Sequence, residues 1–250
     1  MPNIRLLIAY DGTAYAGWQR QALLPTIQGV LEEKIALMAK ATISLHGAGR
    51  TDAGVHALGM VANFHTPANI PCLGWVKGLN SMLPEDIRIR NAEVVDPEFH
   101  ARFRAQGKVY AYQFLSLPIL LPHHRLYYAN IPGTLDLSLM AEAMSTLVGE
   151  HDFTSFEASG SRDLTLAGGR GAVRRIMAAN LERLGEGWAM VIHGDGFLRH
   201  MIRNIAGTLF EVGLGKRTLA DFRETLAARD RGRAGMTAPA KGLFLREVFY

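Results

Sequence analysis

The residues best suited to chemistry lie in a glycine-rich loop at positions 47–57, with the sequence GAGRTDAGVHA. Glycine permits unusual backbone dihedrals and lets a ligand approach the main chain closely. Within this loop Arg50 stands two residues before Asp52. A guanidinium beside a carboxylate keeps the acid ionised at neutral pH, as a nucleophile or general base requires. On spacing alone, a structural turn held by an Arg–Asp pair is the more common explanation.

Several other chemistries lack their motifs in this chain. The loop glycines do not fit the dinucleotide pattern G-x-G-x-x-G, no lysine is placed as in a P-loop, and no G-x-S-x-G elbow occurs. The 9 histidines, among them the adjacent His123 and His124, form no recognisable ligand set, so we expect no metal and no cofactor. The single cysteine, Cys72, lies in an apolar setting typical of a small buried side chain rather than a reactive thiol.

The hydrophobic pattern predicts strands and helices that alternate in two similar halves, an α+β arrangement. We place the halves at residues 1–104, with the Asp52 loop, and 105–250. The first half is predicted to have strands at 4–10, 60–64 and 88–95 and helices at 27–38 and 73–82. The second is predicted to have strands at 109–115, 173–184, 188–193 and 243–249 and helices at 137–148, at 198–212 and after 218. A Gly-, Ser- and Arg-rich loop is expected at 158–171.

Composition argues against a membrane-spanning chain and slightly favours a polyanionic ligand, although each basic group alone is equally typical of a solvated surface. The 250 residues are 48% hydrophobic, enough for a packed core, but no apolar run approaches the roughly 18 residues of a membrane span. The first residues do not resemble a signal peptide, so we expect a cytoplasmic location. The net charge is +4, and most of the 27 basic residues are arginine, which suits phosphate contacts and base stacking. The basic groups are 102/104, 170/174/175, 199/203 and 229/231/233.

Residues 49–56, with the sequence GRTDAGVH, resemble the signature of the TruA family of tRNA pseudouridine synthases. The resemblance extends over nearly the whole chain, in the order of the family's motifs. The further matching segments are YDGT at 10–13, GWQRQ at 17–21, TIQG at 26–29, LNS at 79–81 with LP at 83–84 and DI at 86–87, FHARF at 99–103, DFTSF at 152–156, FLRHMIRN at 197–204 and APAKGL at 238–243. So many ordered matches are not expected by chance.

The resemblance implies roles for individual residues. Asp52 occupies the position of the catalytic carboxylate, and Arg50 that of the arginine that accompanies base flipping. Tyr110 matches the tyrosine that stacks on the target uracil, and Arg203 the arginine that pairs with the catalytic aspartate. Leu243 matches an apolar residue of the uracil pocket. From the residues alone, Arg199 and Arg203 are expected one turn apart on one face of the predicted helix at 198–212, which favours substrate binding by Arg199.

The resemblance also implies a fold, a substrate and an assembly. The fold would be two similar halves sharing a continuous antiparallel sheet, with helices on one side and a basic cleft between the halves. The substrate would be uridine at positions 38, 39 and 40 of the tRNA anticodon arm, bound by a homodimer. Two alternatives remain open from the residues: a non-catalytic tRNA-binding protein or chaperone on the same scaffold, and a different RNA-modifying enzyme such as a methyltransferase.

Overall fold

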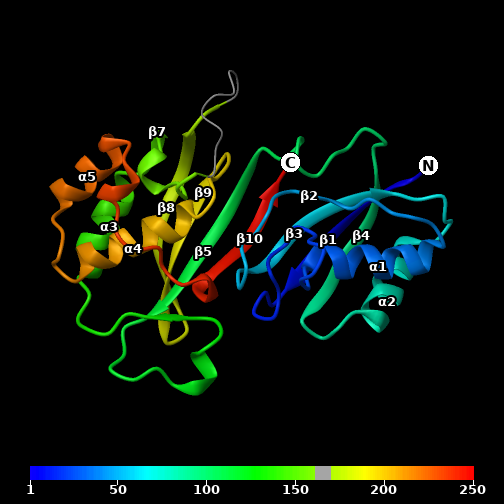
Figure 1. Ribbon diagram of the computed structural model, residues 1–250, viewed down its shortest axis with the longest axis horizontal. Helices are drawn as coiled ribbons and strands as arrows, with labels where there is room; N and C mark the ends of the chain where they lie inside the picture. Colours follow the sequence, from blue (N-terminus) through cyan, green and yellow to red (C-terminus); the bar gives the residue numbers. More distant parts are fainter. Residues whose placement is uncertain (161–169) are drawn as a thin grey trace. The chain divides into compact units, whose positions relative to one another are not determined.

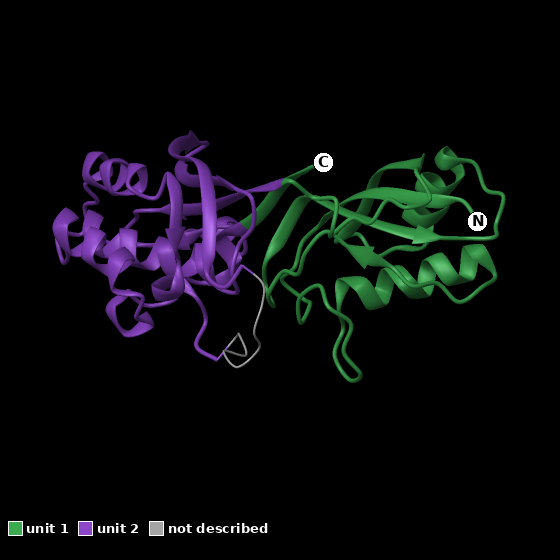
Figure 2. Ribbon diagram, turned by 90° about the horizontal axis from the view of Figure 1, so that it is seen from above, with its two compact units in different colours: residues 1–106, 244–250 green, residues 107–243 purple. Residues whose placement is uncertain are grey.

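The computed structural model describes residues 1–160 and 170–250 of the chain. These residues contain five α-helices and ten strands that belong to one mixed sheet (Figure 1). The α+β class predicted from the sequence is therefore confirmed. The chain divides into two compact units, residues 1–106 with 244–250 and residues 107–243 (Figure 2). Most of the predicted loop at 158–171, including Arg162, lies outside the described residues.

Unit 1 contains strands in the order β4-β1-β3-β10 together with two helices. Its elements are β1 (Asn3–Tyr10), α1 (Ile27–Ala39), β2 (His46–Gly47), β3 (His56–His65), α2 (Cys72–Met82), β4 (Ile87–Val95) and β10 (Leu243–Phe249). β1 runs antiparallel to β3 and β4, and β2 antiparallel to β3, whereas β10 runs parallel to β3. The predicted strands and helices of this half are confirmed, and the short β2 is an addition to them.

The core of unit 1 follows from the alternation of side chains along its first strand. Successive residues of β1 point to opposite faces, and from Ile4 onward the even-numbered positions are the buried ones. The most deeply buried apolar side chains of β1 and α1, at most 2% exposed, are Ile4, Leu6, Ile8, Ile27, Leu31 and Ile35. Thr26 caps α1, because its hydroxyl accepts a hydrogen bond from the Gly29 amide at 3.3 Å. Burial of this apolar face is the main force that holds α1 on the unit.

The described residues of unit 2 contain strands in the order β5-β9-β8-β7, each antiparallel to the next, together with three α-helices. Its elements are β5 (Gly107–Leu115), β6 (Ala129–Asn130), α3 (Leu137–Ser145), β7 (Gly149–Asp152), β8 (Val173–Leu184), β9 (Gly187–Gly194), α4 (Met201–Gly213) and α5 (Leu219–Ala228). Thr218 and Asp221 form a reciprocal capping box that begins α5. Unit 2 therefore has the predicted order of elements up to α5, with β6 and β7 in addition, whereas β10, the last strand predicted for the second half, belongs almost entirely to unit 1.

Helix α4 begins later than predicted, which corrects the expected placement of Arg199. The helix starts at Met201, and Arg199 precedes it. His200 adopts a left-handed conformation with φ of 61°, and the Arg199 carbonyl accepts a hydrogen bond from the Ala158 amide at 2.9 Å. A left-handed residue cannot continue a right-handed helix toward its N-terminus. Arg199 and Arg203 therefore do not lie on one helical face.

The sheet is mixed rather than antiparallel throughout, which corrects a second expectation. β10 runs parallel to β3, and β6 runs parallel to β5. Parallel neighbours require a long connection rather than a tight hairpin. β10 meets this condition because it follows all of unit 2 in the sequence.

None of the helices in the described part of the chain has both the length and the apolar character needed to cross a bilayer.

Candidate active site

The loop that carries Arg50 and Asp52 joins β2 to β3 in unit 1. Backbone hydrogen bonds hold it at both ends. The Ala48 amide donates to the Val61 carbonyl of β3 at 2.8 Å, and the Val55 amide donates to the Asp52 carbonyl at 3.1 Å. Asp52 is partly exposed and Arg50 is exposed. The loop thus presents a carboxylate and a guanidinium to solvent from a fixed main chain.

The N-terminal motif residues support this loop from the side. The Tyr10 hydroxyl lies 2.8 Å from the Thr51 hydroxyl, in hydrogen-bond contact. The Trp18 amide donates to the Thr51 carbonyl at 3.1 Å, and the Gly54 amide donates to the Tyr15 carbonyl at 3.4 Å. The residues on either side of Asp52 are therefore tied to a separate part of the chain, which is how a catalytic group is kept in place.

Two glycines allow the N-terminal segment to pack directly against the loop backbone. A Cβ on Gly12 would lie 2.0 Å from the Val55 carbonyl oxygen, and one on Gly17 would lie 2.5 Å from the Thr51 carbonyl oxygen. Gly17 also has a φ of 93°, a region that disfavours other residues. In addition, the Gly12 amide donates to Nδ1 of His56 at 3.1 Å. Neither Gly12 nor Gly17 therefore has room for a side chain.

Arg50 is oriented by the same N-terminal motif. Its Nε donates to the Oε1 of Gln19 at 2.9 Å. Gln19 belongs to the segment GWQRQ, whose Trp18 is 2% exposed and packs near the ring of Tyr10 at a centroid distance of 6.1 Å. Unit 1 therefore positions both members of the Arg50–Asp52 pair through residues of its own.

The tyrosine predicted to stack on uracil lies in unit 2. Tyr110 is in β5, its side chain is 8% exposed, and its ring meets Phe197 edge to face with a centroid distance of 5.1 Å and an interplanar angle of 81°. Phe197 is the first residue of the motif FLRHMIRN. An edge-to-face neighbour such as Phe197 favours one orientation of the Tyr110 ring plane.

Arg203 and Tyr112 hold the closing motif of the chain. Nε of Arg203 donates to the Ala238 carbonyl at 2.8 Å, and the Ala238 amide donates back to the Arg203 carbonyl at 3.0 Å. The buried Tyr112 donates its hydroxyl to the Pro239 carbonyl at 2.8 Å, and burial raises the pKa of Tyr112 so that it stays a donor. Leu243, 6% exposed, follows this clamped segment. The predicted pairing of Arg203 with Asp52 stays a prediction.

The same order of motifs is found in known proteins. A family model described as tRNA pseudouridine synthase matches residues 6–104 and 143–250. The chain belongs to this family. tRNA pseudouridine synthase A 1 of Desulfotalea psychrophila is 49% identical to it over 100% of both chains. tRNA pseudouridine synthase A of Acetivibrio thermocellus is 44% identical over 100% of both, and tRNA pseudouridine synthase A 2 of Clostridium tetani is 44% identical over 99% of this chain and 98% of its own.

The matched segments bear on the individual site residues of this tRNA pseudouridine synthase family member. They include Arg50, Asp52, Arg199, Arg203 and Leu243, whereas Tyr110 lies in the stretch between them. The full-length relatives cover that stretch as well. Membership of the family agrees with the resemblance inferred from the motifs, while the role of each residue remains a proposal.

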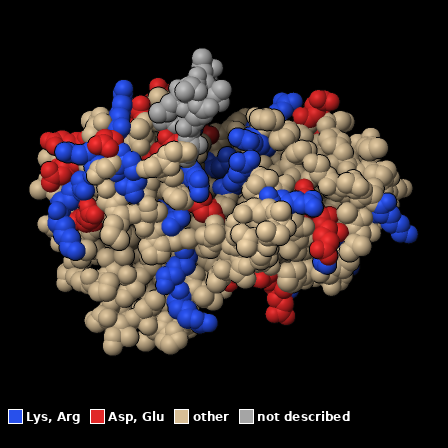
Figure 3. Space-filling model, viewed as in Figure 1, with Lys and Arg blue, Asp and Glu red and all other residues tan. Residues whose placement is uncertain are grey.

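The basic groups noted in the sequence differ in what they contact. Arg229 forms an ion pair with Asp152 at 3.3 Å, and Arg233 lies 3.7 Å from Glu224. Surface pairs of this kind contribute little stability, but they compete with a ligand for the guanidinium. Arg102 and Arg104 are exposed like these two, and the guanidinium carbon of Arg102 lies 6.0 Å from the centroid of the Phe103 ring. Lys and Arg side chains are spread over both units on the face in Figure 3, with Asp and Glu among them.

His100 offers a pH-dependent property that can be measured directly. Burial lowers the pKa of His100 below its usual value of 6.5, and the neighbouring His46 acts in the same direction. In a pH titration followed by the imidazole proton signals in NMR, we expect a His100 midpoint below 6.5 that moves upward in His46→Gln. Because the unfolded chain binds this proton more tightly, the contribution of neutral His100 to stability is complete above about pH 6.5 and decreases at lower pH. A midpoint at or above 6.5 contradicts this account.

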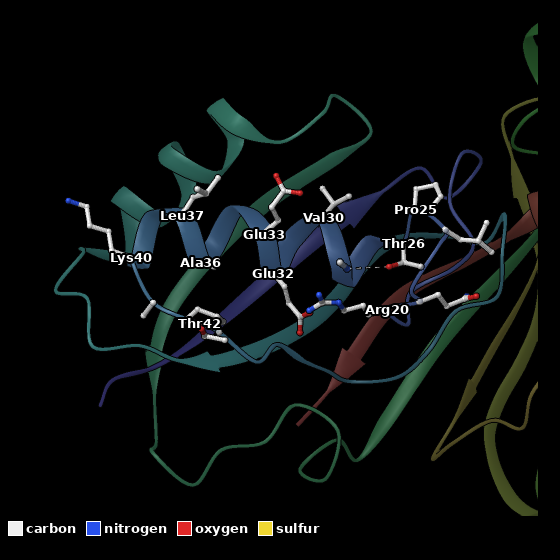
Figure 4. Close-up of a pocket in the computed structure, with 15 residues that line it drawn as sticks. Arg20, Pro25, Thr26, Val30, Glu32, Glu33, Ala36, Leu37, Lys40 and Thr42 are labelled. Atoms are coloured by element: carbon white, nitrogen blue, oxygen red, sulfur yellow. Dashed lines mark hydrogen bonds and ion pairs between the residues drawn. The ribbon is translucent and has the colours of Figure 1, made fainter.

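A groove of about 840 Å³ runs along α1 in unit 1 (Figure 4). Its wall includes Val30, Ala36 and Leu37 from the helix, and an ion pair between Arg20 and Glu32 at 3.2 Å. None of the six proposed site residues lines this groove. The groove is therefore separate from the chemistry proposed for Asp52.

Among the described residues, one set of side chains in unit 2 has the spacing of metal ligands. His123, His124 and Glu186 place their ligand atoms within 4.8 Å of one another. Nε2 of His124 lies 3.0 Å from Oε2 of Glu186, a contact that a hydrogen bond explains without an ion. The set lies outside the proposed catalytic residues. The expectation that the enzyme uses no metal stays a prediction.

The sequence analysis did not recognise the residues that support the site. Gly12, Tyr10 and Trp18 stood only within the motifs at 10–13 and 17–21, and Tyr112 only within the predicted strand at 109–115. Their contacts are long-range, since the hydrogen bond between Tyr10 and Thr51 joins residues 41 positions apart. The available signal was the set of motifs itself, because residues that contact a catalytic loop accompany it in a family pattern.

Proposed function

We propose that this protein isomerises uridine to pseudouridine in tRNA, with Asp52 as the catalytic carboxylate. The reaction breaks the bond between N1 of uracil and C1′ of the ribose, rotates the base, and forms a bond between C5 and C1′. The proton on C5 is lost to solvent and N1 takes up a proton. No electrons are transferred to another reactant, so the reaction needs no cofactor.

The proposal rests mainly on the loop with Arg50 and Asp52, which the N-terminal motif holds in place in a chain that belongs to this family. A uridine in a stem must leave the stack before its C1′ can be reached, which costs a few kcal/mol. In the proposal, Arg50 accompanies the flipped nucleotide and contacts phosphate, Tyr110 stacks on the uracil, and Leu243 lines its pocket. Asp52 attacks C1′ or assists departure of the uracil, Arg203 orients this carboxylate, and Arg199 contributes to substrate binding.

The substrate positions are part of the proposal. The expected targets are uridines 38, 39 and 40 of the anticodon arm. The test uses tRNA transcripts labelled with uridine tritiated at C5, because isomerisation releases that tritium to water. We expect release from transcripts with uridine at any of the three positions and none when all three are replaced by cytidine. Release from the replaced transcript would move the site elsewhere in the tRNA.

A non-catalytic tRNA-binding protein or chaperone is the alternative on the same scaffold. It predicts tRNA binding without tritium release from any transcript. The alternative is disfavoured because the chain retains a carboxylate on a loop that several independent contacts hold in place. A protein that only binds RNA has no use for a fixed Asp52.

The hydroxyl of Tyr110 can be separated from its ring. In Tyr110→Phe the ring and its contact with Phe197 remain, so we expect the tRNA dissociation constant to change by less than about twofold. In Tyr110→Ala the stacking surface is lost and affinity falls by about tenfold, the lower range of base–aromatic stacking. Fluorescence anisotropy with labelled tRNA measures both. A slower single-turnover rate in Tyr110→Phe at unchanged affinity assigns a proton-transfer role to the hydroxyl, and an equal loss of affinity in both variants contradicts stacking.

The proposal includes a homodimer that binds one tRNA with both subunits and a cytoplasmic location, where tRNA is processed. Light scattering of the protein with and without tRNA tests the first statement. A monomer at concentrations where tRNA is modified contradicts it.

A further inference from the structure

The rings of His46, His100 and Phe103 form a ladder of tilted contacts that ends in an exposed side chain. The ring centroids of His46 and His100 are 4.9 Å apart, and those of His100 and Phe103 are 4.3 Å apart, with interplanar angles of 35° in both pairs. Phe103 is 77% exposed, while no other Phe, Tyr or Trp side chain in the described ranges exceeds the 37% of Tyr127 and Phe249. A phenylalanine so exposed gains little from burial, so its position calls for another explanation.

Hydrogen bonds hold the segment that precedes Phe103 in place as far as Ala101, and the exposed residues begin at Arg102. The Phe99 carbonyl accepts hydrogen bonds from the side-chain amides of Asn3 at 2.9 Å and Asn63 at 3.1 Å. The buried Ala101 donates its amide to Oδ1 of Asn63 at 2.8 Å, and its carbonyl accepts from the Tyr250 hydroxyl at 2.9 Å. The exposed ring therefore projects from an anchored turn and not from a loose loop.

Local hydrogen bonds fix the ladder itself. The Arg102 amide donates to Nδ1 of His100 at 3.1 Å, and the Arg104 amide donates to the His100 carbonyl at 3.0 Å. His46 forms the other end, and it directly precedes Gly47, the first residue of the Asp52 loop. The ladder thus links the exposed ring to the loop with the proposed catalytic residues, within unit 1.

Positive charge borders the ring on both sides in sequence. Arg102 and Arg104 are exposed, and the guanidinium carbon of Arg102 lies 6.0 Å from the Phe103 centroid. Residues 99–106 contain no acidic residue. An aromatic face between arginines is the combination that binds single-stranded nucleic acid, because bases stack on the ring while phosphates meet the guanidinium groups. A contact with another protein chain would instead favour a continuous apolar patch, whereas both neighbours of Phe103 are charged.

We propose that Phe103 is a stacking site for an unpaired base of the RNA substrate, with Arg102 and Arg104 on the adjacent phosphates. This inference rests on the proposed function for the nature of the ligand. The stacked base continues the series of rings from His46 through His100 and Phe103. The site supplies RNA affinity at a point other than the flipped uridine, so it acts on binding and not on the chemical step.

The test compares tRNA binding and single-turnover tritium release in Phe103→Ala, Phe103→Trp and wild type. We expect Phe103→Ala to raise the tRNA dissociation constant by about tenfold, within the range of one base–aromatic stack. The rate at saturating tRNA stays at the wild-type value. Phe103→Trp restores affinity, and its added fluorescence is quenched by tRNA. Ile119→Ala is the matched control, because Ile119 is 78% exposed, and it is expected to leave the affinity unchanged.

Salt dependence separates the ring from its charged neighbours. Each phosphate contact contributes to the slope of the logarithm of affinity against the logarithm of salt concentration, whereas stacking does not. We expect Arg104→Ala to reduce this slope by about 1 and Phe103→Ala to leave it unchanged.

Three outcomes overturn the inference. Unchanged tRNA affinity in Phe103→Ala shows that no base stacks there. A reduced maximal rate at unchanged affinity places Phe103 in the chemical step. A lower molecular mass of Phe103→Ala in light scattering shows that the ring contacts a second copy of the chain. Failure of the proposed function is recognised separately, because wild-type protein would then bind tRNA without releasing tritium while the binding comparison could still be made.

Discussion

Replacement of Asp52 by alanine is expected to reduce tritium release from tRNA by about 10⁴-fold or more, the order observed when a single catalytic group is removed from a preorganised site. The proposed reaction depends on this carboxylate, and an alanine side chain can act neither as a nucleophile nor as a base. The affinity for tRNA is expected to be unchanged or slightly higher, since the substitution removes a negative charge from a surface that meets phosphates. Single-turnover kinetics and equilibrium binding measure the two quantities separately.

The matched control for Asp52→Ala is Glu33→Gln, which removes an exposed carboxylate of the same unit. Glu33 lies on α1 and contacts Lys34 at 2.6 Å, away from the loop. Its loss is expected to change neither rate nor affinity. Asp52→Asn keeps the shape of the side chain and removes only its charge, so it should be as inactive as the alanine variant. Substantial activity in either Asp52 variant would assign the chemistry to another residue.

The long elements of the fold were predictable because their patterns are local. The apolar alternation of residues 4–10 and the helical spacing after Thr26 each describe one face of one element, and both elements are confirmed. The sequence pattern also marked 243–249 as a strand. It did not show that β10 pairs parallel with β3, because the choice of partner depends on contacts between residues far apart in the chain.

The start of α4 shows where local patterns are insufficient. The apolar spacing continues from Leu198 into the helix, so the pattern alone favours an early start. The structure instead places a left-handed residue at His200, which is not readable from side-chain periodicity. Such strained conformations concentrate near functional sites, where surrounding contacts maintain them. The predicted pairing of Arg199 with Arg203 on one face failed for this reason.

The sequence predicted the reactive groups of the candidate site, Arg50 and Asp52, but not the residues that hold them in place. Arg50 and Asp52 are neighbours in sequence, so their association needed no tertiary information. Gln19, which accepts the hydrogen bond from Arg50, is 31 positions away. The proximity of Glu186 to His124, 62 positions away, was likewise invisible, although the adjacent histidines were noted. Contacts of this range depend on the sheet register and follow only from the folded chain.

The second large loss of activity is expected for Gly12→Ala, because Gly12 packs directly against the backbone of the Asp52 loop. A Cβ at this position would lie 2.0 Å from the Val55 carbonyl oxygen, far inside van der Waals contact, so the loop backbone must move. The Val55 amide is hydrogen-bonded to the Asp52 carbonyl, and the Gly12 amide to His56, so the displacement reaches the proposed catalytic residue. A misplacement of about 1 Å lowers catalysis by about 100-fold. We expect this loss in kcat/KM for tritium release, together with a destabilisation of about 1–3 kcal/mol from overpacking.

A control must show that the loss comes from the loop and not from any glycine substitution. Gly74→Ala in α2 serves this purpose, because its Cβ would meet side-chain atoms and no backbone; the nearest is Cγ2 of Ile70 at 2.9 Å, which adjusts by rotation of that side chain without moving the Asp52 loop. Alanine is also the better helix former there, so stability and activity should remain near wild type. Thermal unfolding and single-turnover tritium release, measured on both variants, give the comparison. Full activity in Gly12→Ala would mean that the position of Asp52 does not depend on the N-terminal motif, and the argument that this motif positions the catalytic loop would fail.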